Sequence, residues 1–253
     1  MPLNRSLLTV PVFVVGTAFG SSSCAAEPEP VVSDSSAASD GETQTELAKE
    51  PVFQPDLSGL PAKQKELYTH YASLLDENSS QEGTWVFVAD MTVDEAVDRL
   101  LGPEPRVVTP KDERRLDSGA WSAYSFTPVG TGVVAFERTG FADPRGRRLA
   151  ALSAGGGVSA VATGDVEAMS RFGYARDGKI VFDEVDYAFV EDLERIPAEV
   201  RDLAALVWAG PGSFSAETGD WFVAALAMAE LVTGVRVDPS GYDALTKYLV
   251  RIG

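Results

Sequence analysis

The dipeptide Asp177-Gly178 is the feature that most constrains the fold, because it separates two β-prone runs by the two residues that a tight hairpin turn requires. In an antiparallel hairpin closed by these two residues, Arg171 on the first strand stands opposite Glu184 on the second. The sequence therefore predicts a hairpin over residues 170–185, with an opposite-charge pair across its strands.

Further β-prone runs, each bounded by turn residues, occur through the middle of the chain. They cover residues 84–89, 121–126, 133–138 and 158–162. Short strands of this kind, separated by turns, are typical of an antiparallel sheet.

Helical periodicity flanks the strand runs and interrupts them. The predicted helices begin at Pro61, follow a capping box of Thr92 and Glu95, and cover residues 144–152, 197–208, 216–233 and 240–251. The predicted fold class is α+β: a largely antiparallel sheet with helices packed on one face and a C-terminal helical segment. The nine apolar residues 221–229 are too few to span a membrane, and indicate a helix that is buried on most sides.

The N-terminus has the pattern of an export signal, with Arg5 before an apolar stretch and small residues before Cys24. Cys24 stands where a lipoprotein signal places its acylated cysteine, although Ser21 replaces the usual apolar residue three positions earlier. We therefore predict a signal peptide over residues 1–23 and lipidation of Cys24, at the outer face of the cytoplasmic membrane. An ordinary signal peptidase that cuts after Ala25 is the alternative, and the product would be secreted.

Residues 24–60 are predicted to be a disordered acidic tether, because eight acidic residues and one lysine stand there among Ser, Ala and Pro. Residues 61–253 are predicted to form a single α+β domain, itself acidic with 30 acidic and 19 basic residues. The whole chain has a formal charge of −17, which repels phosphate backbones. Nucleic acid is therefore not an expected partner.

Several kinds of catalytic and metal site are excluded because the chain has one cysteine and one histidine. No disulfide, no cage of several Cys or His ligands, and no nucleophile–His site independent of His70 can form. His70 lies beside the apolar face of the first predicted helix, which favours a structural role. The acidic residues between 183 and 194 lack the spacing of a calcium loop, and we interpret them as a solvated edge. We predict no catalytic residue, no metal site and no cofactor.

Short landmarks in a fixed order carry a family resemblance. They are Phe87-Val88, residues 92–96, residues 100–102, Gly119-Ala120-Trp121, residues 136–141, residues 170–174 leading into Asp177-Gly178, residues 224–229 and residues 233–235. In this order and spacing, the chain resembles an actinobacterial domain-of-unknown-function family of uncharacterised proteins. The resemblance supports the fold and implies no activity. Thr139 and Phe141 stand where other members tend to have Asn and Trp, so a polar site there would be altered.

Aromatic residues are concentrated in the predicted strands, and a cluster on a sheet face without helices would mark a contact surface. Trp121 and Phe141 are the aromatic candidates for binding. Glu137 and Arg171 are the polar candidates, since both are charged residues inside the landmark strands.

These observations predict a lipid-anchored extracytoplasmic binding or interaction protein without catalytic activity, whose partners are the membrane and a protein or small ligand. One alternative is a carboxylate-dependent secreted hydrolase, which requires two acids about 5 to 10 Å apart in a cleft. Another is an acidic immunity-type or inhibitor-type protein that masks a basic partner by its charge.

Overall fold

The computed structural model describes residues 55–78, 83–116, 120–164, 170–210, 220–237 and 246–251. The chain divides into two units, Met1–Lys49 and Glu50–Gly253, and all of the described residues belong to the second. The predicted signal peptide, Cys24 and most of the predicted tether lie outside the described residues.

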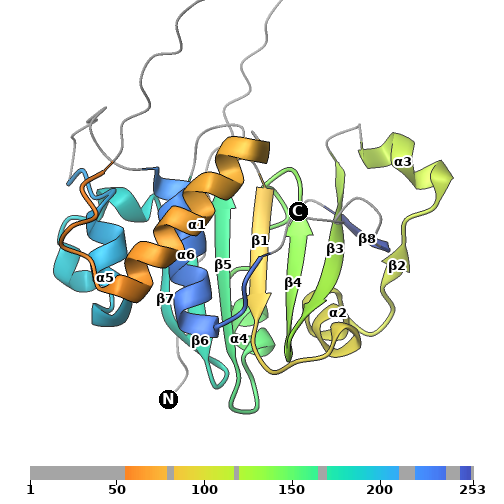
Figure 1. The fold of residues 1–253 in the computed structure, drawn as a ribbon. Helices are drawn as coiled ribbons and strands as arrows, with labels where there is room; N and C mark the ends of the chain where they lie inside the picture. The colour runs from red at the N-terminus through yellow and green to blue at the C-terminus, as the bar shows by residue number, and fades with distance from the viewer. Residues whose placement is uncertain are drawn as a thin grey trace, which may run out of the picture. The chain divides into compact units, whose positions relative to one another are not determined.

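An antiparallel sheet of eight described strands is the centre of this unit (Figure 1). The strands are β1 (Gly83–Val88), β2 (Arg106–Val107), β3 (Trp121–Val129), β4 (Gly132–Glu137), β5 (Val158–Gly164), β6 (Ser170–Arg176), β7 (Lys179–Val185) and β8 (Lys247–Arg251). Their order is β2-β8-β3-β4-β1-β5-β6-β7, and neighbouring strands are antiparallel throughout. The predicted α+β class is confirmed.

Helices cover both faces of the sheet. The helices are α1 (Ala62–Asn78), α2 (Val93–Leu101), α3 (Pro110–Leu116), α4 (Arg147–Leu152), α5 (Ala198–Ala205) and α6 (Trp221–Thr233), with short 3-10 turns at Tyr187–Phe189 and Leu193–Arg195. As expected, α1, α5 and α6 form one layer, and they pack on the face that carries Phe87 and Phe172. The opposite face, which carries Val86 and Val161, packs against α2 and α4.

The second helical layer differs from the prediction of helices on one face. Every residue of β1 is buried, both those that face α6 and those that face α2. A strand that is buried on both faces reads as a continuous apolar run and not as an alternation of apolar and polar residues, so the apolar run of residues 85–88 was itself a signal of a second layer.

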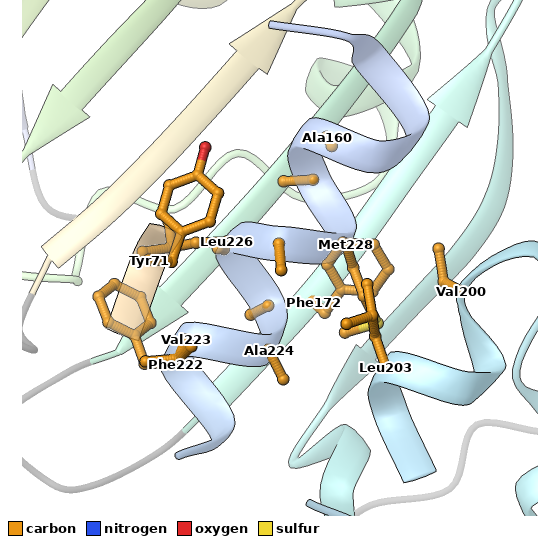
Figure 2. Close-up of a cluster of buried hydrophobic side chains, with 14 of the residues drawn as sticks. Tyr71, Ala160, Phe172, Val200, Leu203, Phe222, Val223, Ala224, Leu226 and Met228 are labelled. Atoms are coloured by element: carbon orange, nitrogen blue, oxygen red, sulfur yellow. The ribbon is translucent and has the colours of Figure 1, made fainter. Parts of the chain in front are cut away.

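Helix α6 is the centre of the larger core, as its nine apolar residues predict. Asp220 begins the helix, because its carboxylate accepts hydrogen bonds from the backbone N–H groups of Phe222 (2.8 Å) and Val223 (3.1 Å). Figure 2 shows α6 between Tyr71 of α1 on one side and Leu203 of α5 on the other. Within the described ranges, every helix is too short or too polar to be a transmembrane segment.

The prediction of a helix over residues 240–251 is wrong for its C-terminal part, which is strand β8. This strand pairs with β3 on one side and with β2 on the other. The rings of Tyr248 and Phe126 are 5.6 Å apart, and Leu249 is buried. The pairing that makes this segment a strand joins it to residues more than a hundred positions earlier, so local periodicity could not predict it. Residues 238–245 lie outside the described residues.

The predicted hairpin forms, but the predicted register holds only beside the turn. Asp177 and Gly178 have positive φ angles of 49° and 74°, as this two-residue turn requires. A β-bulge then leaves Val181 without a partner, which shifts all later pairs by one residue. The predicted pair of Arg171 and Glu184 is therefore wrong: Arg171 lies opposite Val185.

Candidate functional site

A pocket of about 400 Å³ lies between α3 and the strands β3, β4 and β8. Its lining residues are Glu113, Leu116, Trp121, Ser122, Ala123, Ser125, Phe136, Arg138, Thr139 and Lys247. In Figure 1 this part of the sheet is to the side of α1 and α6, where β3 begins beside α3. The volume is within the usual range for small-molecule sites, about 300 to 1,000 Å³.

The floor of the pocket is low because β3 carries small side chains between longer ones on its neighbours. Ser125 pairs with Phe136 of β4 on one side and with Lys247 of β8 on the other. Ala123 is two residues away on the same face of β3. Because adjacent strands are about 4.8 Å apart, the larger side chains of β4 and β8 form walls about 10 Å apart.

Residues of β1 fix the position of the Phe136 ring in the pocket wall. Its ring centre lies 4.4 Å from that of Trp85 on β1. Gly83 lies under the same ring, where an added Cβ would be 2.7 Å from Phe136 and also 2.7 Å from the backbone oxygen of Glu137. The positive φ of Gly83, 129°, also favours glycine. The ring of Phe136 therefore needs a glycine at residue 83.

Helix α3 forms the opposite wall and is fixed by Asp112. The buried carboxylate of Asp112 accepts hydrogen bonds from the hydroxyl of Thr109 (2.6 Å) and from the guanidinium of Arg106 (2.5 Å). The hydrogen bond from the Thr109 hydroxyl is the main reason that the pKa of Asp112 is below its usual value. Asp112 therefore stays ionised at neutral pH and keeps α3 against the sheet edge.

Glu137, a predicted binding residue, is buried beneath the pocket and organises the β4–α4 loop, residues 138–146. Its carboxylate accepts hydrogen bonds from the Thr139 backbone N–H (2.7 Å), the Thr139 hydroxyl (2.6 Å) and the Gly140 backbone N–H (2.9 Å). It also accepts one from the Ser122 hydroxyl. These bonds position Arg138 and Thr139 at the pocket, while the carboxylate itself is occupied.

Arg171, the second polar candidate, is also buried, with 2% of its side chain exposed. Its guanidinium forms ion pairs with Asp143 of the β4–α4 loop and with Asp183 of β7, the latter at 2.6 Å. It also donates to the carbonyl oxygen of Pro144 (3.3 Å). Burial raises the pKa of Asp143, and the positive charge of Arg171 opposes that rise. Arg171 therefore attaches the β4–α4 loop to the sheet rather than lining the pocket.

The two aromatic candidates lie in different places. Trp121 lines the pocket. Phe141 is on the β4–α4 loop with 43% of its surface exposed, and is not part of the lining. Of the four predicted residues, the structure thus places Trp121 in the pocket and Glu137 beneath it. Arg171 and Phe141 lie outside it.

Sequence reasoning missed the two cations of the pocket, Arg138 and Lys247. Arg138 lies inside the family landmark 136–141, directly after the candidate Glu137, so the landmark was a signal that could have identified it as a binding candidate. Lys247 had no such signal, because its segment was predicted to be helical. Both side chains are exposed, and within the part of the chain that the structure describes neither forms an ion pair.

The pocket offers binding groups rather than a pair of catalytic acids. Among the described residues of its lining, Glu113 is the one carboxylate. Asp143 and Asp183 lie close together because both bind Arg171, but the guanidinium compensates their charge and neither lines the pocket. No group of three or more His, Cys, Asp or Glu side chains suited to a metal ion occurs in the described ranges.

Comparison of the chain with family models, with curated proteins and with solved structures found no match. The resemblance to an actinobacterial family stays a prediction.

Proposed function

We propose that this chain is a binding protein, held at the outer face of the cytoplasmic membrane by lipid on Cys24, and that its α+β unit takes a small ligand in the pocket between α3 and β3, β4 and β8. The observation that carries the proposal is the pocket itself. It has a floor of small residues, aromatic walls at Trp121 and Phe136, and at its rim the cations Arg138 and Lys247, which form no ion pair with any described residue.

The support behind the pocket walls favours binding. Trp85 and Gly83 fix Phe136, Asp112 fixes α3, and Glu137 fixes the start of the β4–α4 loop. Walls that are ordered before the ligand arrives lower the entropy cost of binding. The hydrolase alternative requires two acids in one cleft, and no observation of this pocket favours it over binding.

Three probes that share one ring system test the proposal: 2-naphthoate, 2-naphthamide and 2-naphthylmethylammonium. Titration calorimetry on the purified full chain should detect binding of at least one of them. Ala123→Leu fills the pocket floor with a larger side chain, and should weaken that binding at least about tenfold.

Ala198→Leu is the matched control, because Ala198 is an exposed residue at the start of α5, outside the pocket lining. It makes the same change of side chain and should leave the affinity within about twofold of the wild type. Binding that Ala123→Leu does not weaken would contradict the pocket as the site. If none of the three probes bound, the proposed function would also be contradicted.

A further inference from the structure

The charges at the pocket rim differ in sign from those of the unit that carries them. Residues 61–253 have 30 acidic and 19 basic residues, yet the pocket lining has two cations and one acid. Arg251 adds a third cation on the same side, since it pairs with Trp121 and stands four residues along β8 from Lys247, an even spacing that keeps both on one face. An anion is repelled by most of this unit's surface and attracted at this site.

The hydrogen bonds that the lining residues already form determine which of their polar groups can still bind a ligand. The hydroxyls of Ser122 and Thr139 already donate to Glu137, and that of Ser125 donates weakly to the carbonyl oxygen of Phe136 (3.4 Å). Three kinds of side-chain donor in the described lining remain for a ligand: the neutral indole N–H of Trp121, the guanidinium of Arg138 and the ammonium of Lys247. Arg138 and Lys247 are cationic donors, which form their strongest hydrogen bonds with anionic oxygens.

Arg138 and Lys247 stand on opposite sides of β3, so their side chains can reach one group held above Ala123 and Ser125. The side chains of Trp121 and Phe136 line the same space and suit a flat apolar body. From this combination we infer that the ligand is a small organic anion with a planar apolar body, such as an aromatic carboxylate. Its carboxylate or other acidic oxygens bind between Arg138 and Lys247, and its ring lies against Trp121 and Phe136.

This inference depends on the proposed binding function, and the same three probes separate the two. 2-Naphthoate should bind at least about tenfold more tightly than the neutral 2-naphthamide, the ratio that one charge-assisted hydrogen bond gives. The cationic 2-naphthylmethylammonium should bind most weakly. The preference for the anion should decrease as the salt concentration rises from about 0.05 to 0.5 M, because salt screens the charges.

Four single variants and one double variant test the assignment of residues. Arg138→Gln and Lys247→Gln should each weaken 2-naphthoate binding about five- to tenfold with little effect on 2-naphthamide, and the double variant should remove the preference for the anion. Glu113→Gln should have the opposite effect and tighten 2-naphthoate binding about two- to threefold, because it removes the negative charge from the lining. Arg147→Gln is the control: it removes an exposed positive charge outside the pocket, and should change the affinity less than about twofold.

The other possible results of these titrations distinguish failure of the ligand class, of the residue assignment and of the binding function. If 2-naphthamide bound as tightly as 2-naphthoate and Ala123→Leu abolished both, the binding function would stand and the anionic ligand class would be overturned. A preference for the anion that persists in the double variant would overturn the assignment to Arg138 and Lys247. Absence of binding by all three probes would overturn the inference together with the proposed function.

Discussion

Two buried charged side chains, Arg171 and Glu137, hold the β4–α4 loop on the sheet. Arg171 binds Asp143 within the loop, and Glu137 binds Thr139 and Gly140 at its start. A charge that is buried without a partner is costly, so each of these residues stabilises the fold only while its partners are in place. The contribution of Arg171 and that of Glu137 to the free energy of unfolding can be measured separately with single substitutions.

Arg171→Met should lower the free energy of unfolding by about 3 to 5 kcal/mol at pH 7, because it removes the buried cation shared by Asp143 and Asp183 and leaves Asp143 with only the exposed Arg145, at 3.0 Å. Burial already raises the pKa of Asp143, and loss of the guanidinium should raise it further. A carboxyl group whose pKa is higher in the folded than in the unfolded chain destabilises the fold as the pH rises through that pKa, and the loss is recovered as the pH falls.

The deficit of Arg171→Met relative to the wild type should therefore be smaller at pH 5 than at pH 7. Urea unfolding at both pH values measures it. An equal or larger deficit at pH 5 would show that the lost ion pairs are not the cause.

Glu137→Gln should lower the free energy of unfolding by about 2 to 3 kcal/mol. The amide keeps one oxygen acceptor but places an NH₂ group against donors from Thr139, Gly140 or Ser122. Because Arg138 follows Glu137 directly, binding of 2-naphthoate should weaken too. Glu104→Gln, at an exposed position, should change neither property. A Glu137→Gln chain with wild-type stability would refute the role assigned to this carboxylate.

At the scale of elements, β8 and the bulge in β7 decide what the neighbouring residues do. Strand β8 covers the edge that β3 would otherwise expose, and brings Lys247 to the pocket. The bulge at Val181 moves Glu184 away from Arg171, and Glu184 instead pairs with Arg195 at 3.0 Å. Because β7 is an edge strand, its bulge also disfavours pairing with another chain.

Leu249→Asp tests β8. The side chain of Leu249 is 7% exposed and lies between Ala123 and Arg106 in the neighbouring strands. A carboxylate there should lower the free energy of unfolding by about 2 to 4 kcal/mol, because apolar burial is lost and a charge loses water. Arg251→Gln, at an exposed position of the same strand, should have little effect. Equal urea midpoints for the two variants would argue against the pairing of β8 with β3.

At the scale of the whole molecule, we predict that the protein is located at the membrane through lipid on Cys24. Lipid on Cys24 would bring the acidic unit close to the membrane, and the chain between them would set the distance. In the native host, the wild-type protein should appear in the membrane fraction with its mature form beginning at Cys24 and carrying added acyl mass. Cys24→Ala should abolish both properties.

The intact mass also separates the alternatives. A wild-type protein in the medium that begins after Ala25, without acyl mass, would identify ordinary secretion. An unmodified chain in the cytoplasm would overturn the predicted location.

Local patterns in the sequence were sufficient where a few adjacent residues decide the conformation. Asp177-Gly178 predicted its turn because the two residues tolerate positive φ angles, and Thr92 with Glu95 predicted the start of α2 because their side chains satisfy its first N–H groups. The α+β class followed from the alternation of such elements. The apolar run of α6 predicted its burial, since nine consecutive apolar residues on a helix are stabilised when the helix is shielded from water on most sides.

The tertiary structure decided the remaining features, because each depends on contacts between distant residues. Strand β8 exists through pairing with β3, and the partners of Arg171 were set by a bulge and by a loop 28 residues away. The pocket joins Arg138 to Lys247 across β3, and no local pattern places those two cations together. The sequence by itself determined those elements whose conformation a few adjacent residues fix, and the polarity of their faces. Only the packed sheet determined that residues 247–251 form a strand, which charges meet, and which are left for a ligand, because pairing energies between strands outweigh local preference.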